Sequence, residues 1–209
     1  MPDFETIEQQ VEVGGHQFTL TTLADNQQFH DPNGVFEAAG VAPAMWSLFG
    51  ILWESGLLLA EAMVTEPLAD RTILETGCGL GLASMVIAHR GGTVIASDLH
   101  PLAGEFLSIN VRHNHLQPIP FETLDWHHEY ATLDKFDMII GSDLLYERGQ
   151  PELLANFVDH HSKAKSTMIL TDPGRKQVGA YTRLMEANGF TSSIETHDTV
   201  RLIRYERST

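Results

Sequence analysis

Hydrophobic and polar positions divide the chain into a short N-terminal part and a longer part in which strand and helix patterns alternate. Residues 7–13 and 16–23 alternate on either side of a glycine pair, which predicts a two-residue β-hairpin. The apolar stretch 42–64 then predicts one or two helices. We therefore expect residues 1–65 to form a hairpin and helical extension packed on a core of residues 66–209.

From Thr72 onward, short apolar runs alternate with stretches of helical periodicity. The predicted strands are 72–75, 93–97, 120–124, 136–141, 166–170, 192–196 and 201–205, and the predicted helices are 82–89, 102–114, 152–161 and 178–188. This alternation is typical of an α/β fold, a Rossmann-like doubly wound seven-stranded sheet, mostly parallel, with an antiparallel C-terminal hairpin. Ligands of such sheets bind at the carboxyl ends of the strands.

Three glycines, Gly77, Gly79 and Gly81, separate the first core strand from its helix. Glycines at such a turn allow the backbone to approach a ligand and direct free N–H groups at it. The dinucleotide pattern G-x-G-x-x-G fails, because Leu82 and Ser84 stand where its third glycine is required. A nicotinamide oxidoreductase is therefore disfavoured.

Asp98 follows the second core strand, where a carboxylate can accept hydrogen bonds from both hydroxyls of a ribose. This placement suits any adenosine ligand. The alternative is that Asp98 caps the next helix.

Composition narrows the class of protein. The formal net charge is -15 at pH 7 without a run of lysines or arginines, which argues against a nucleic-acid partner. The single cysteine, Cys78, fits a reducing compartment. The N-terminus shows no signal-peptide pattern, and the apolar stretch 45–64 contains Glu54 and Glu61, which suits a buried helix better than a membrane span. We expect a cytoplasmic protein of one globular unit without a membrane partner.

Glu75, the three glycines and Asp98 together resemble the class I S-adenosylmethionine-dependent methyltransferases, whose first motif is an acidic residue followed by G-x-G-x-G. The resemblance implies that S-adenosylmethionine is the cofactor and S-adenosylhomocysteine the product. It also implies that the glycine loop packs against the methionine part, that Glu75 organises the loop and the amino group, and that Asp98 holds the ribose. The implied cofactor-binding residues are Trp53, Glu75, Gly77, Cys78, Gly79, Gly81, Asp98, Leu99, Asp125, Trp126 and Ser142.

The stretch "IIGSDLLYE" ends the fourth core strand and contains D-x-x-Y, Asp143 to Tyr146. With "LWESG" around Trp53, it resembles methyltransferase family 16, many of whose members methylate lysines on proteins. The resemblance implies that Asp143 and Tyr146 are catalytic and face the acceptor. Glu54 departs from the proline or aspartate that commonly follows the tryptophan. Alternatively, Asp143 caps a turn and Tyr146 packs under the next helix.

Two further stretches flank the expected site. In "LDWHH", Asp125 is the candidate for the adenine amino group, and Trp126 either flanks the ring or packs in the core. In "TDPGRK", Arg175 and Lys176 either meet an acidic substrate or are turn residues. The motif "NPPY" of base methyltransferases is absent, which again disfavours nucleic acid.

Other chemistry finds little support. The eleven histidines lack metal-site spacing, so we expect no metal. The preferred function is methyl transfer to a protein side-chain nitrogen, most simply that of lysine. A small-molecule acceptor and a non-catalytic cofactor-binding module remain the alternatives.

Overall fold

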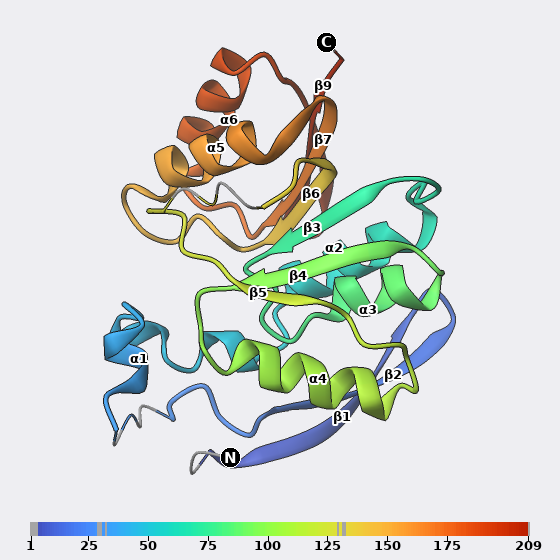
Figure 1. The fold of residues 1–209 in the computed structure, drawn as a ribbon, viewed down its shortest axis with the longest axis vertical. Coiled ribbons are helices and arrows are strands. Elements are labelled where there is room, and N and C mark those ends of the chain that lie inside the picture. The colour runs from blue at the N-terminus through green and yellow to red at the C-terminus, as the bar shows by residue number, and fades with distance from the viewer. Residues whose placement is uncertain (1–3, 29–30, 32, 129, 131–132, 209) are drawn as a thin grey trace.

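The N-terminal hairpin forms as predicted in the computed structural model (Figure 1). The structure describes residues 4–28, 31, 33–128, 130 and 133–208. Strands β1 (Thr6–Val13) and β2 (His16–Leu23) make a separate antiparallel two-stranded sheet that closes with the pair Val13 and His16.

The core is a seven-stranded sheet with the strand order β5-β4-β3-β6-β7-β9-β8. Its strands are β3 (Thr72–Thr76), β4 (Thr93–Asp98), β5 (Phe121–Thr123), β6 (Phe136–Ser142), β7 (Ser162–Asp172), β8 (Thr191–His197) and β9 (Val200–Arg207). Pairing is parallel from β5 to β7, and β9 runs antiparallel to both β7 and β8. The predicted fold class is confirmed, with the switch in strand order lying between β3 and β6.

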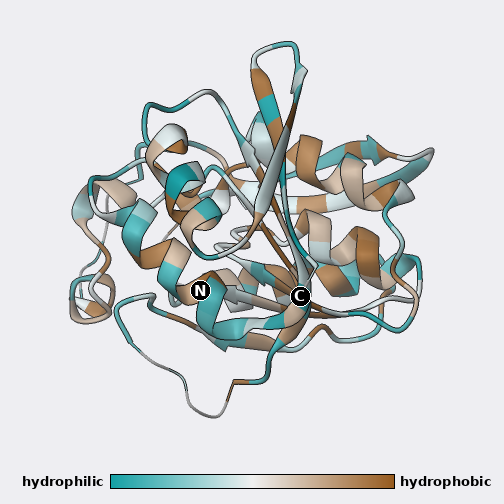
Figure 2. Cartoon of the chain, turned by 90° about the horizontal axis from the view of Figure 1, so that it is seen from above, coloured by the Kyte–Doolittle hydropathy of each residue, from teal (hydrophilic) through white to brown (hydrophobic). Residues whose placement is uncertain are grey.

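Alternate residues of the central strands face two different layers. Ile73 packs with the cluster of helices α2 (Glu54–Thr65), α3 (Leu82–His89) and α4 (Ala103–His113), whereas Leu74 packs with α5 (Gln150–His161) and α6 (Val178–Ala187). The same alternation recurs on the other central strands, so both faces of the sheet are covered. Most of the helices carry hydrophobic and hydrophilic residues side by side, as expected for helices with one packed face (Figure 2).

The stretch 42–64 differs from the simple helical prediction. It contains two short 3₁₀ turns, η1 (Pro43–Met45) and η2 (Leu48–Gly50), and becomes α-helical only at α2. A Cβ at Gly50 would lie 2.4 Å from Leu23 Cγ, so the chain passes tightly against β2 before the helix begins. By length and composition alone, Pro43–Thr65 would suffice to cross a membrane, yet Leu59 and Met63 of α2 are fully buried in this fold. A short helix that the sequence did not predict, α1 (Val35–Ala38), precedes this stretch.

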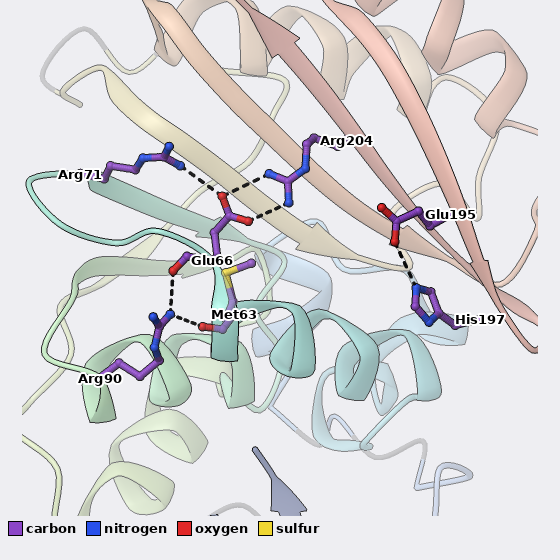
Figure 3. Close-up of polar contacts among 7 residues, drawn as sticks. All are labelled: Met63, Glu66, Arg71, Arg90, Glu195, His197 and Arg204. Atoms are coloured by element: carbon purple, nitrogen blue, oxygen red, sulfur yellow. Dashed lines mark hydrogen bonds and ion pairs between the residues drawn. The ribbon is translucent and has the colours of Figure 1, made fainter. Parts of the chain in front are cut away.

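A buried carboxylate fixes the end of α2. Glu66 accepts hydrogen bonds from Arg71, just before β3, and from both terminal nitrogens of Arg204 on β9 (Figure 3). Arg90, at the end of α3, donates to the carbonyl oxygens of Met63 and Glu66. Because three arginines from different elements meet here, α2 is tied to the sheet and to α3.

Asn110 of α4 and Asn114, which caps the end of this helix, dock the N-terminal hairpin. Asn110 accepts the N–H of Thr21 at 2.7 Å, and Asn114 accepts the N–H of Thr19 at 2.9 Å and returns a bond to the Thr19 carbonyl at 2.8 Å. One helical turn apart, the two amides imitate a neighbouring strand along the outer edge of β2. The hairpin shares one hydrophobic cluster with α2, α3 and α4. The division at residue 65 stays a prediction.

Candidate active site

A cavity of about 480 Å³ opens at the carboxyl ends of β3, β4 and β6. This is the place at which a doubly wound sheet binds its ligands. All the predicted site residues contribute to its wall: Trp53, Glu75, Gly77, Cys78, Gly79, Gly81, Asp98, Leu99, Asp125, Trp126, Ser142, Asp143 and Tyr146. The fold thus brings together residues from five separate stretches of sequence.

The loop between β3 and α3 depends on glycine for its backbone. Gly77, Gly79 and Gly81 have φ angles of 64°, 51° and 74°, in the left-handed region that side chains disfavour. A Cβ on Gly79 would lie 2.9 Å from the carbonyl oxygen of Phe49, which is backbone and cannot turn aside. The loop is therefore held closely between Phe49 of η2, next to Gly79, and Leu107 of α4, next to Gly81.

Glu75 is a buried carboxylate at the end of β3. Its Oε2 accepts hydrogen bonds from the backbone N–H, at 2.9 Å, and the hydroxyl of Ser84 in α3. Burial raises the pKa of Glu75 to about 7, although both Ser84 bonds favour the charged form. Among the described residues, none donates a hydrogen bond to Oε1, so this oxygen is available to a donor in the cavity.

Asp98 joins the glycine loop to β4. Its Oδ2 accepts the N–H of Gly79 at 2.9 Å, and its Oδ1 accepts the N–H of His100 at 2.8 Å. Burial raises the pKa of Asp98, and these backbone bonds oppose the shift. Helix α4 begins with Leu102 as its N-cap and without a side-chain cap, so the alternative role of Asp98 as a helix cap is wrong. Each oxygen keeps a lone pair for a further donor.

Asp125 and Trp126 follow β5, the strand next to β4, and also line the cavity. The carboxylate of Asp125 lies 2.7 Å from Nδ1 of His127 and 3.1 Å from Nδ1 of His128, both exposed. The indole N–H of Trp126 donates to Thr76 Oγ1 at 2.9 Å. Trp126 packs against the α5–α6 cluster, as the core interpretation requires, and it also lines the cavity, so its contact with an adenine ring stays a prediction.

At the end of β6 the chain turns through Asp143, whose φ of 52° is unusual for a residue with a side chain. The Asp143 N–H donates to the Thr171 carbonyl at 2.8 Å. Both carboxylate oxygens accept from Arg175, which donates through Nε to Oδ1 and through its terminal nitrogen to Oδ2 at 2.9 Å. The Arg175 guanidinium carbon also lies 5.8 Å from the centre of the Tyr146 ring. Arg175 is therefore a turn residue, which was one of the two interpretations of "TDPGRK", and it also lines the cavity.

Hydrophobic anchors hold this loop against the glycine loop. A Cβ added to Gly77 or to Gly141 would lie 2.5 Å from a methyl carbon of Leu144, which fills the space between them. Leu145 is fully buried among the residues of the α5–α6 cluster. Tyr146 is 38% exposed at the mouth, and burial of its hydroxyl raises the pKa to about 12, so it stays a neutral phenol.

The sequence did not reveal one wall of the cavity. It comes from the segment between β2 and α2, and its members are Gly40, Val41, Met45, Leu48, Phe49, Ile51 and Leu52. His100 adds a buried ring stacked on Phe49 with centroids 3.9 Å apart. Most of these residues lie in the stretch 42–64, whose apolar pattern predicted helix, so nothing in the sequence marked them as a cavity wall.

Solved structures of similar fold define the class. The Thermus thermophilus 16S rRNA methyltransferase RsmC, in complex with AdoMet and guanosine, aligns with a TM-score of 0.68 at 18% identity, covering 99% of this chain and 51% of its own. The ribosomal protein L11 methylase of Lactobacillus delbrueckii aligns with a TM-score of 0.58 at 19% identity, over 74% and 77% of the two chains. At such identities the likeness concerns the fold, which is that of the class I methyltransferases.

The sequence defines the family more closely. The lysine methyltransferase family matches residues 43–186, and the chain belongs to it. Protein N-lysine methyltransferase METTL21A of Xenopus tropicalis is 28% identical over 205 residues, 92% of this chain and 91% of that protein. The electron transfer flavoprotein beta subunit lysine methyltransferase of Danio rerio is 30% identical over 65% of this chain and 55% of its own, so this chain spans just over half of that relative.

Proposed function

We propose that this enzyme transfers a methyl group from S-adenosylmethionine to the side-chain amine of a lysine in a protein. One observation carries the proposal: a single cavity joins the glycine loop, Glu75 and Asp98 on one side to Asp143 and Tyr146 on the other. The family and its relatives among protein-lysine methyltransferases support the acceptor class.

The residues on the β3 and β4 side suit this cofactor. Glu75 offers a buried oxygen to an amino group, and Asp98 offers two oxygens, already held in place by backbone N–H groups, to ribose hydroxyls. Trp126 and Leu99 supply apolar surface in the same cavity. When bound, the cofactor supplies an electrophilic methyl group, and the amine lone pair forms the N–C bond as the C–S electrons return to sulfur.

The residues on the β6 side act on the acceptor. A lysine amine has an ordinary pKa of about 10.4, so it must lose a proton before its lone pair can attack. The apolar walls of the cavity lower that pKa by desolvation. Tyr146, a neutral phenol at the mouth, can accept a hydrogen bond from the amine and orient it, and water at this exposed rim takes the proton.

Exposure at the mouth favours a protein acceptor over a small molecule. Trp53 is 37% exposed and Tyr146 is 38% exposed, although both line the cavity. A side chain carried on another protein can therefore enter while its backbone stays outside. We also propose, from charge and composition, a cytoplasmic enzyme without nucleic-acid or membrane partners.

The test is incubation of the purified enzyme and methyl-labelled cofactor with a cell extract, followed by mass spectrometry of the labelled molecules. We expect label on lysine side chains of one or a few proteins. The variants Asp143→Ala and Tyr146→Phe should reduce this labelling. Label confined to free metabolites would overturn the protein acceptor, and no heat on calorimetry with either S-adenosylmethionine or S-adenosylhomocysteine would overturn the enzymatic function.

A further inference from the structure

The two oxygens of Asp143 are already occupied by this chain's own Arg175. The guanidinium forms a bidentate pair with the carboxylate, a geometry that is stronger and more specific than a single contact. The side chain of Asp143 is 14% exposed and that of Arg175 is 38% exposed, so the pair lies partly out of water. The pair also raises the pKa of Arg175, which is therefore always charged. An approaching amine thus meets a carboxylate whose negative charge is balanced by Arg175.

Hydrogen bonds outside the ion pair hold the backbone of each partner in place. Asp172 is fully buried at the end of β7, and its Oδ1 accepts the N–H of Gly174 at 2.7 Å and of Arg175 at 2.6 Å. These bonds fix the turn from which the Arg175 side chain leaves. On the other side, the N–H of Asp143 is bonded to the Thr171 carbonyl. The pair therefore joins two rigid strand ends, β6 and β7.

We infer that Arg175 is a positioning residue for the acceptor: it fills the carboxylate fork of Asp143 and covers one face of the Tyr146 ring, so that Asp143 meets the lysine as half of a neutral pair. This inference rests on the proposed lysine methylation. Arg175 itself touches neither the reacting nitrogen nor the methyl group in this role. It acts through Asp143 and Tyr146.

The charge of Arg175 has a chemical consequence for the acceptor. A free carboxylate beside a lysine ammonium stabilises the charged form and raises its pKa, typically by about 1–3 units at close range. The ammonium has no lone pair and cannot attack. By neutralising Asp143, Arg175 keeps the amine easier to deprotonate. In the described part of the chain, the ionisable groups that line the same cavity or act on the pair include Tyr146, Glu147 and Arg148 on the same loop, Asp172 on β7, Glu75 on β3, Asp98 on β4 and His100 after it, and Asp125 and His127 beyond β5.

The experiment measures turnover of the protein labelled in the extract, as a function of pH, for the variants Arg175→Gln and Arg175→Lys. For Arg175→Gln we expect kcat to fall on the order of 100-fold, as for a misplaced acceptor, and the acidic limb of the kcat profile to move up by about one pH unit or more. Arg175→Lys keeps the positive charge but cannot form the bidentate pair with Asp143. The acidic limb should therefore lie at its wild-type position, while kcat recovers only in part.

Binding of S-adenosylhomocysteine separates this role from general damage. Leu144 and Leu145 anchor the loop without help from Arg175. The affinity of both variants for S-adenosylhomocysteine should therefore stay at the wild-type value. Lys176→Gln is the matched control, because it removes the same charge from the adjacent, exposed residue. In the double variant Asp143→Asn/Arg175→Gln the free carboxylate is gone, so the acidic limb should return to its wild-type position.

Failure of the proposed function and failure of the inference about Arg175 give different results. If the wild type labels no protein, the proposed function falls and this inference with it. If the wild type is active and Arg175→Gln keeps both its kcat and its acidic limb, only the inference is overturned. A limb that shifts equally in Lys176→Gln, or that stays shifted in the double variant, also overturns it.

Discussion

The two sides of the cavity are held by different means. On the β3–β4 side, left-handed glycines and backbone hydrogen bonds fix the wall, Glu75 is buried and Asp98 is partly buried. On the β6–β7 side, an ion pair between Asp143 and Arg175 sets the side chains, and Tyr146 stands partly in solvent. A wall fixed by the backbone, here called the rigid side, suits a ligand that is always the same. A wall whose chemistry is set by side chains, here called the adjustable side, can be fitted to a particular acceptor by substitution.

The sharpest test of the rigid side is Gly79→Ala. The left-handed backbone costs about 1–2 kcal/mol with a side chain. The Cβ would also push the loop away from Phe49 and break the hydrogen bond from the Gly79 N–H to Asp98. Loss of these contacts should total about 3 kcal/mol, or roughly 100-fold in S-adenosylhomocysteine affinity by calorimetry. Gly91→Ala is the control, since Gly91 has a φ of 76° but open space around it. Equal losses in both variants would show that strain alone is responsible.

Glu75→Gln removes a charge from the same side. A charged hydrogen bond contributes about 1.5–3 kcal/mol, so affinity for S-adenosylhomocysteine at pH 8 should fall roughly 10- to 100-fold. Because the pKa of Glu75 is raised to about 7, the wild-type carboxylate becomes protonated below that pH and can no longer pair with an ammonium. Wild-type affinity should therefore weaken about tenfold per pH unit below 7. A Glu75→Gln variant with the same pH dependence would contradict this assignment.

Tyr146→Phe tests the adjustable side. The ring and its contact with Arg175 remain, and only the hydroxyl is lost. One hydrogen bond to the acceptor amine is worth about 1 kcal/mol, so kcat on the labelled protein should fall roughly five- to tenfold. Affinity for S-adenosylhomocysteine should stay constant. A loss of cofactor affinity with unchanged kcat would reverse the roles of the two sides.

The smallest effect is expected for Trp126→Phe. The variant keeps an aromatic ring against the cavity but loses the bond from the indole N–H to Thr76. We expect roughly a two- to fivefold weaker affinity for S-adenosylhomocysteine and unchanged kcat at saturating cofactor. Unchanged affinity would assign Trp126 to the core alone.

The contrast between the two sides also explains what the sequence could predict. Gly77, Gly79, Gly81 and Glu75 lie close together in the chain, and their spacing reflects one strand-to-helix turn, so the motif could be recognised directly. The alternation of strands and helices likewise gave the sheet and its C-terminal hairpin.

The partner of Asp143 could not be predicted in this way. Arg175 lies 32 residues further along the chain and reaches Asp143 only because β6 and β7 are parallel neighbours whose ends coincide. The 3₁₀ turns before α2 were missed for a related reason, since Gly50 packs tightly on Leu23 and the α-helix begins only at Glu54. Contacts between distant segments decide both features, and neither leaves a local pattern.

The asparagine contacts along β2 affect how this part of the molecule opens. Thr19 and Thr21 lie on the outer edge of a two-stranded sheet, where backbone amides ordinarily exchange with deuterated water quickly. Their N–H groups are instead bonded to Asn114 and Asn110, so exchange at these two positions requires the hairpin to leave α4. Amide exchange at Thr19 and Thr21 therefore reports the detachment of the whole hairpin rather than fraying of its edge.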